Sequence, residues 1–360
     1  MLKHLFTTAL VTCAVGVGSS VSAQENQGVV VSRASSEGNF GLSFWSEEKL
    51  SETEPLEWYE NAPDSPTSLA DDGNLGEPGF VAGGPPRNRD SLQAPENNDV
   101  DIDNGSQSLA PKSDDDFSLA VRNAHDGYPV DDTYYQNNLP WRAIGKLAFT
   151  TAGGNASCTA SVISPRDVIV TAAHCCYDLA AGSFNQNFVF APAYRRGPVG
   201  NFIFPFATAR VSTGWVNTGQ RQFDVCVINL RSNAAGQRVA TVTGWLGRSW
   251  NFPAEIHQFV HGYPGNLGEG EVLQTCASET FSDPSCNGPA VVHTGCDMTF
   301  GSSGGPWIKD FTPKGTSGPV NFVNSVVSGY DACSGTFGGV FNGARFTSQN
   351  IVPLCNAAGC

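Results

Sequence analysis

The distribution of charge and cysteine divides this chain near residue 122. Residues 24–122 carry 20 acidic and 6 basic side chains, abound in Pro, Gly, Ser and Asn, and contain no cysteine. Residues 123–360 carry 14 acidic and 13 basic side chains and hold ten of the 11 cysteines. A strongly charged segment with few apolar runs cannot bury enough surface to fold alone. The sequence therefore predicts a largely disordered acidic leader followed by one folded domain.

The net charge of -14 is mostly a property of the leader. Since the second part is nearly neutral, the overall charge says nothing about acidic or basic substrates of the folded domain. We expect no nucleic-acid partner.

The first residues have the layout of a secretory signal peptide. Lys3 and His4 precede an apolar run over 5–17, and small residues end at Ala23. This pattern predicts a signal peptide over 1–23 and a secreted, extracellular protein. No later segment is long and apolar enough for a membrane helix, so we expect no membrane partner.

Residues 24–122 fit either a linker or a propeptide that blocks the folded domain or assists its folding. A cysteine-free acidic tract between a signal peptide and a compact domain favours the propeptide. Arg87, Arg89 and Arg122 are candidate cut sites.

Ten cysteines in an exported chain predict up to five disulfides. Zinc is disfavoured because no Cys-x-x-Cys spacing occurs and because Cys175 and Cys176 are adjacent, which does not suit tetrahedral ligation. We expect no metal. Cys355 and Cys360 are expected to staple the C-terminal tail.

Residues 123–360 show many short apolar runs between Gly, Pro and Asn turns, with little helical periodicity. The predicted strands are Ala143–Thr151, Cys158–Ile163, Val168–Thr171, Asn187–Ala191, Val225–Leu230, Val239–Gly244, Gln258–His261, Pro306–Ile308, Val323–Ser328 and Gly339–Phe346. This pattern indicates an all-β sandwich or barrel, with paired barrels as one form.

Two motifs place a potential proton carrier and a carboxylate at strand ends. His174 follows the apolar run Val168–Thr171, and Asp224 precedes the apolar run Val225–Leu230. Imidazole accepts and returns protons near neutral pH, and a carboxylate can orient it. Taken alone, a His beside a Cys is more often structural, and the Asp could be an ordinary strand-capping residue.

The segment Gly301-Ser302-Ser303-Gly304-Gly305-Pro306 is more specific. Glycines around a serine permit a tight loop in which the amides of Gly301 and Ser303 converge on one point, where they could bind an oxyanion. A plain Gly-Ser surface loop is the alternative.

The order of His174, Asp224 and Ser303, with their local contexts, resembles the chymotrypsin and trypsin-like serine protease superfamily. Subtilisins and α/β-hydrolases use other orders. The segments 187–194 and 261–265 resemble the bacterial and fungal glutamyl endopeptidase branch. This resemblance spans about residues 141–346.

The resemblance implies a fold of two six-stranded antiparallel β-barrels with the active site between them, over 123–360. It further implies a secreted serine endopeptidase that acts through an acyl-enzyme on Ser303. His174 would be the general base and acid, Asp224 would orient it, and the amides of Gly301 and Ser303 would form the oxyanion hole. A disulfide between Cys158 and Cys175 is implied. The partners expected are protein or peptide substrates of a monomer, with no cofactor.

The resemblance also implies a substrate-binding strand at Ser328, Gly329 and Tyr330. Asp297 lies six residues before Ser303, where trypsin-like enzymes carry the acid that binds Arg or Lys side chains, but it could equally sit in a rebuilt loop. Glutamate specificity is disfavoured because Val327 stands where the glutamyl enzymes carry a His.

Ser302 replaces the Asp that binds the new amino terminus in digestive enzymes. Activation by an inserted amino terminus is therefore not expected, and simple removal of the propeptide is. Two rival functions remain: a catalytically silent homologue acting as a binding module, and an esterase or amidase acting on small molecules.

Overall fold

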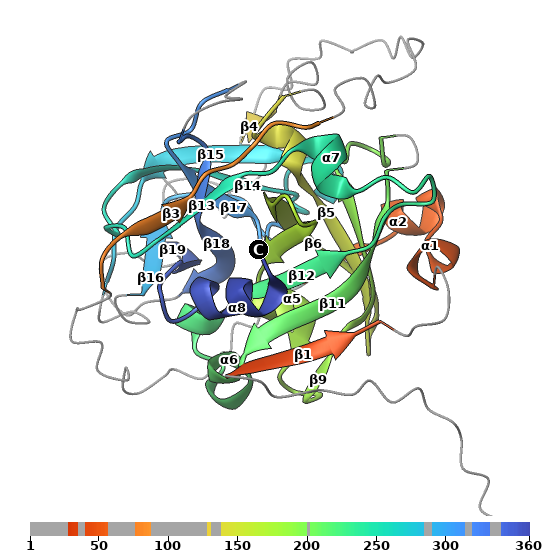
Figure 1. Ribbon diagram of the computed structural model, residues 1–360, viewed down its shortest axis with the longest axis horizontal. Helices are drawn as coiled ribbons and strands as arrows, with labels where there is room; N and C mark the ends of the chain where they lie inside the picture. Colours follow the sequence, from red (N-terminus) through yellow and green to blue (C-terminus); the bar gives the residue numbers. More distant parts are fainter. Residues whose placement is uncertain are drawn as a thin grey trace, which may run out of the picture.

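The computed structural model describes residues 28–34, 40–56, 76–87, 128–130, 138–199, 202–283, 290–313, 319–331 and 340–360. Two β-sheet units dominate them, and short segments of the leader lie against both units (Figure 1). The predicted signal peptide, the candidate cut sites Arg89 and Arg122, and the cysteines Cys286 and Cys333 lie outside the described residues.

The first unit is a closed antiparallel barrel of six strands. Its strands are β5 (Ile144–Thr151), β6 (Gly154–Ser164), β7 (Val168–Thr171), β10 (Gln186–Pro192), β11 (Phe204–Ser212) and β12 (Cys226–Leu230). They follow the order β11-β10-β5-β6-β7-β12, and β12 pairs back onto β11. Fully buried phenylalanines at 149, 188, 190 and 204 belong to its core.

The second unit is a nine-stranded sheet. Its strands are β3 (Gly79–Val81), β4 (Tyr128–Pro129), β13 (Gly247–Trp250), β14 (His257–Gly262), β15 (Gln274–Glu279), β16 (Val291–Thr294), β17 (Pro306–Lys309), β18 (Phe322–Asp331) and β19 (Val340–Arg345). The main path is β16-β19-β18-β17-β14-β15-β4, and β13 joins β18 to β3. This is the chymotrypsin-like, all-β fold expected from the sequence. The second unit has nine strands instead of the six expected, and β3 and β4 account for two of the three additional strands.

Short helices lie between the strands and after the last of them. They are α5 (Ala173–Cys176), α6 (Thr213–Thr218), α7 (Val239–Thr243), α8 (Ile351–Ala358) and the 3-10 turns η2 (Trp141–Ala143), η3 (Arg221–Phe223) and η4 (Gly268–Gly270). A small hairpin joins β8 (Tyr177–Asp178) to β9 (Ser183–Phe184). None of the helices in the described ranges has the length and apolar character needed to span a membrane.

The strand predicted at Val239–Gly244 is wrong, because this segment forms helix α7. The Asp167 carboxylate accepts a hydrogen bond from the Ala240 N–H, and the Thr243 hydroxyl donates to the Val239 carbonyl. These contacts satisfy the polar groups of a one-turn helix buried against the barrel, so tertiary packing overrides the β-propensity of Val and Thr.

Three segments of the leader are ordered against the folded domain. Strand β1 (Val29–Arg33) pairs with β11, helices α1 (Phe40–Phe44) and α2 (Glu47–Ser51) lead to β2 (Glu54–Pro55), and β3 pairs with β13. Figure 1 shows β1 along β11 and β3 beside β13, at separate places on the molecule. Because these segments add to existing sheets, they need no core of their own, which is why composition alone did not indicate them.

Three disulfides join described cysteines: Cys158–Cys175, Cys176–Cys226 and Cys276–Cys296. Cys355 and Cys360, expected to staple the tail, are free thiols in this structure.

Candidate active site

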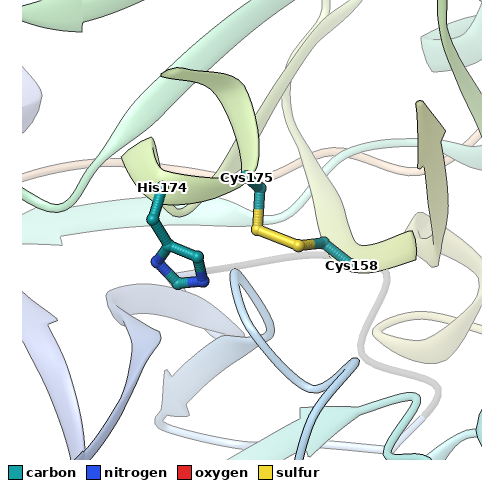
Figure 2. A group of neighbouring side chains, drawn as sticks. All are labelled: Cys158, His174 and Cys175. Carbon is teal, nitrogen blue, oxygen red and sulfur yellow. A yellow bond between two sulfur atoms is a disulfide. The ribbon is translucent and has the colours of Figure 1, made fainter. Parts of the chain in front are cut away.

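His174 lies on the one-turn helix α5, directly after strand β7. Its two following residues are both disulfide-bonded: Cys175 to Cys158 on β6, and Cys176 to Cys226 on β12. Figure 2 shows the imidazole ring beside the Cys158–Cys175 bridge. The adjacent cysteines thus fasten the His174 backbone to two strands of the barrel.

Asp224 accepts two hydrogen bonds from His174. Its Oδ1 accepts from the His174 backbone N–H at 2.8 Å, and its Oδ2 accepts from Nδ1 at 2.8 Å. The Asp224 side chain is 1 % exposed. Burial acts to raise the pKa of this carboxyl, but the charge and hydrogen bonds of His174 outweigh burial and hold the pKa below its usual value. The pair is therefore built to keep Asp224 ionised and the imidazole oriented.

Ser328 on β18 also belongs to this network. Its hydroxyl donates to Asp224 Oδ2 at 2.5 Å, a contact that further lowers the Asp224 pKa. The substrate-binding strand predicted from the sequence is thereby tied to the carboxylate that orients His174.

Ser303 lies in a loop held from both sheets. On one flank, the N–H of Thr159 on β6 donates to the Ser303 carbonyl, and the Thr159 hydroxyl donates to the Gly301 carbonyl. On the other flank, the Gly304 N–H donates to the Val327 carbonyl of β18. Ser303 sits between the two units as a result.

Two glycines are required by the shape of this loop. Gly301 and Gly304 have φ angles of +90° and +78°. A Cβ at Gly301 would lie 2.4 Å from the Tyr263 carbonyl oxygen, and one at Gly304 would lie 1.9 Å from the Thr171 hydroxyl oxygen. Both positions combine a left-handed backbone with close approach, which other residues cannot adopt without strain. Within the described part of the chain, the Gly301 and Ser303 N–H groups donate to no protein acceptor.

The side-chain atoms predicted to act as nucleophile and base are both buried. Ser303 is 0 % exposed, and its Oγ and His174 Nε2 are both buried without a hydrogen-bond partner among the described residues. The Oγ–Nε2 hydrogen bond is therefore not formed in this state. Such bonds are often long or poorly aligned until substrate binds.

Asp297 and Tyr330 meet near the predicted specificity pocket. The Tyr330 hydroxyl hydrogen-bonds to the Cys296 and Met298 carbonyls at 2.9 and 2.7 Å. Burial, followed by the negative charge of Asp297, raises the pKa of Tyr330 above its usual value. The Asp297 backbone carbonyl accepts a hydrogen bond from Asn266. Asp297 thus lies near Tyr330 of β18, directly after Cys296, which the disulfide to Cys276 holds in place.

Sequence reasoning missed two residues that shape this region. The Arg221 guanidinium donates to the Ser328 hydroxyl and the Tyr330 carbonyl at 3.5 and 3.3 Å. Thr159 supports the Ser303 loop, as described above. Arg221 lies three residues before Asp224, and its closeness in sequence to this candidate could have indicated it. No feature of the sequence around Thr159 indicates its role.

Two groups of potential metal donors cluster in the described residues, Cys158 with His174 and Cys175, and Cys276 with Cys296 and Asp297. All four cysteines are in disulfides, so none is available as a thiolate ligand.

Comparisons with known proteins agree with this geometry. The trypsin family model matches residues 131–348. The solved structure of protease Anisep from Arthrobacter nicotinovorans is 27% identical with a TM-score of 0.52, and the match covers 60% of this chain and 95% of that one. The thermostable serine protease AL20 from an extremophilic microorganism is 29% identical with a TM-score of 0.51, over 60% of this chain and 96% of that one.

A Glu endopeptidase in complex with MPD is 21% identical with a TM-score of 0.47, over 64% of this chain and 95% of that one. No curated protein matches the sequence. The family match spans more than half of the chain and contains the six-stranded barrel and seven of the nine strands of the second unit. The chain therefore belongs to the trypsin family and is a serine endopeptidase.

Proposed function

We propose that this protein is a secreted serine endopeptidase whose catalytic residues are His174, Asp224 and Ser303. The observation that carries the assignment is the buried hydrogen-bond chain from Ser328 through Asp224 to His174, beside the glycine-shaped loop of Ser303. Substrates are proteins or peptides.

In the proposed reaction, Ser303 Oγ attacks the carbonyl carbon of the scissile peptide bond while His174 Nε2 removes its proton. The C–N bond then breaks, and His174 protonates the leaving amine. Water, activated by His174, hydrolyses the ester on Ser303 and restores the serine. Asp224 keeps the proton on Nδ1 and stabilises the charged imidazole. This chemistry requires no metal or organic cofactor.

The amides of Gly301 and Ser303 are proposed as the oxyanion hole. The peptide planes that carry these two amides are held through their carbonyl groups, since the Phe300 carbonyl accepts from the Gly265 N–H at 2.7 Å and the Ser302 carbonyl accepts from the Gly305 N–H at 2.8 Å. Two preorganised donors aimed at the developing negative charge lower the barrier of both half-reactions.

Ser328, Gly329 and Tyr330 are proposed to bind the substrate backbone on the acyl side. We further propose that Asp297 attracts a basic side chain at the cleavage site, because its charge already acts on Tyr330 of that strand. Asp297→Asn should then reduce cleavage after Arg and Lys without reducing reaction of Ser303 with a small phosphonate probe.

Residues 1–23 are proposed as the signal peptide, 24–122 as a propeptide and 123–360 as the protease domain of a monomeric, extracellular enzyme. The three disulfides suit an oxidising compartment.

The deciding experiment compares the processed protein with Ser303→Ala on a mixed peptide library, with cleavage sites read by mass spectrometry. Cuts that vanish in Ser303→Ala are expected. Absence of any Ser303-dependent cut would favour a catalytically silent binding module, and turnover of esters alone would favour an esterase.

A further inference from the structure

The end of the second ordered leader segment lies on a strand of the catalytic barrel. Strand β2 (Glu54–Pro55) pairs in parallel with Ala156–Ser157 of β6, and the Leu56 N–H donates to the Ser157 carbonyl at 2.9 Å. The other edge of β6 is occupied there by β5, while β7 pairs with β6 only from Ser161 onward. The leader therefore adds a strand to an edge that would otherwise be open, as extended peptides do.

This position is next to the loop of the nucleophile. A Cβ at Gly301 would lie 3.1 Å from Pro55 Cβ, and one at Gly265 would lie 2.9 Å from Pro55 Cγ. Two residues beyond Ser157, Thr159 donates to the Ser303 carbonyl. The Pro55 ring thus packs against Gly301, one of the two proposed oxyanion residues.

The contact between Pro55 and Gly301 lies on the β6 side of the Ser303 loop. The loop is bonded to β6 on one flank and to β18 on the other. Under the proposed function, on which this inference rests, the acyl part of a substrate pairs with Ser328–Tyr330 of β18. The part that leaves after cleavage must then extend over the β6 flank, where Glu54–Leu56 lie.

We propose that the β6 edge at Ala156–Ser157, together with Gly265 and Gly301, is a docking surface for the leader segment Glu54–Leu56. The docked segment holds the leaving-group side of the cleft and keeps the enzyme latent. The burial of Ser303 Oγ and His174 Nε2 agrees with a closed state, since attack requires the substrate carbonyl carbon to contact Oγ.

The preceding residues anchor the segment. Trp45 is 4 % and Leu50 is 1 % exposed, and Trp45 Nε1 donates to the Asn187 carbonyl of β10 at 2.6 Å. Helix α2, which carries Leu50, is capped by the Ser46 hydroxyl, which accepts from the Lys49 N–H. A tether fixed this close gives Glu54–Leu56 a high effective concentration at the cleft, against which a free substrate must compete.

Charge also favours this occupant. Burial lowers the pKa of the Lys146 ammonium; its ion pair with Glu271 at 2.7 Å opposes this fall most, and the negative charge of Glu54 adds a smaller contribution in the same direction. Lys146 lies on β5, the strand beside β6, so the charge of Glu54 is compatible with the strands on which the segment lies.

The test uses the full chain, with mass spectrometry to show that the leader is intact at assay time. Leu56→Pro removes the N–H that bonds to Ser157, and Pro55→Gly removes the ring that packs on Gly301. Glu52→Ala, an exposed change near the same segment, is the matched control. Unfolding temperatures establish that each variant folds.

Two rates are measured: cleavage of an internally quenched peptide that spans both sides of the scissile bond, and labelling of Ser303 by a small fluorophosphonate. Leu56→Pro should raise the peptide rate about fivefold, the factor for one hydrogen bond of about 1 kcal/mol. Pro55→Gly should raise it as well, and Glu52→Ala should leave it unchanged.

Ser303-dependent cleavage at equal rates in the parent, both variants and the control would overturn the docking inference while leaving the proposed function intact. If no variant showed Ser303-dependent cleavage or labelling, even after proteolytic removal of the leader, both the inference and the proposed function would be wrong.

Discussion

Replacing Asp224 by Asn keeps the shape of the side chain but changes which of its atoms carry hydrogen. The His174 backbone N–H is a fixed donor to Oδ1, so the amide oxygen of the new side chain must take that position. The amide nitrogen then occupies the place of Oδ2, facing His174 Nδ1 at 2.8 Å. It donates to Nδ1, which forces the imidazole proton onto Nε2.

An imidazole with its proton on Nε2 cannot remove the proton of Ser303. We therefore expect kcat to fall about 10⁴-fold, which is about 5 kcal/mol of transition-state stabilisation. KM should change little, because Asp224 is buried and does not contact substrate. The assay is steady-state hydrolysis of a peptide anilide by the processed enzyme, with active sites titrated independently.

Ser328→Ala is the control for loss of hydrogen bonding without a change of tautomer. It removes one hydrogen bond to a charged group and should cost about tenfold in kcat. The reasoning is refuted if Asp224→Asn keeps more than about one tenth of the parental kcat, or if both variants lose the same amount.

Three further predictions concern stability and the tail. The folded-state pKa of Asp224 is depressed, so its contribution to stability is present above its unfolded pKa of about 3.9 and is lost as the pH falls through the folded value. The free energy of unfolding, measured with urea at a series of acid pH values, should therefore fall less steeply with decreasing pH in Asp224→Asn than in the parent. Glu271→Ala removes the partner that lies 2.7 Å from the Lys146 ammonium, a group only 2 % exposed, and should lower the free energy of unfolding in urea by about 3–5 kcal/mol. The double variant Glu271→Ala/Lys146→Met no longer buries an unpaired charge and should recover most of that free energy. The free thiols of Cys355 and Cys360 hydrogen-bond to each other, which raises the pKa of Cys355 and lowers that of Cys360; because the thiolate is the reactive form, alkylation of the folded protein should label Cys360 faster than Cys355, and equal rates would contradict this.

Much of the fold was predictable because its strands have local signatures. The apolar runs at Val168–Thr171 and Val225–Leu230 were predicted as strands, and β7 and β12 occupy them. Strand β15 was missed because its sequence, Gln-Thr-Cys-Ala-Ser-Glu, is mostly polar or small. Its place in the sheet comes from pairing with β14, a contact that has no local signature.

The residues of the candidate site were predicted from the sequence, but one of the contacts between them was not. His174, Asp224 and Ser303 were predicted from their order along the chain together with their local contexts, because each motif alone is also compatible with a structural role. The link from Ser328 to Asp224 spans 104 residues, and nothing in either segment alone indicates it.

The sequence by itself determined which residues could do the chemistry, because side-chain pKa and backbone freedom are properties of residue type and close neighbours. Its composition also predicts that the leader does not fold on its own. Only the tertiary structure decided where the leader goes: Pro55 lies on Gly301, and Leu56 pairs with Ser157, about 100 residues further along the chain. An open strand edge offers hydrogen bonds to any extended segment within reach, so the choice of partner depends on where the folded chain holds that segment.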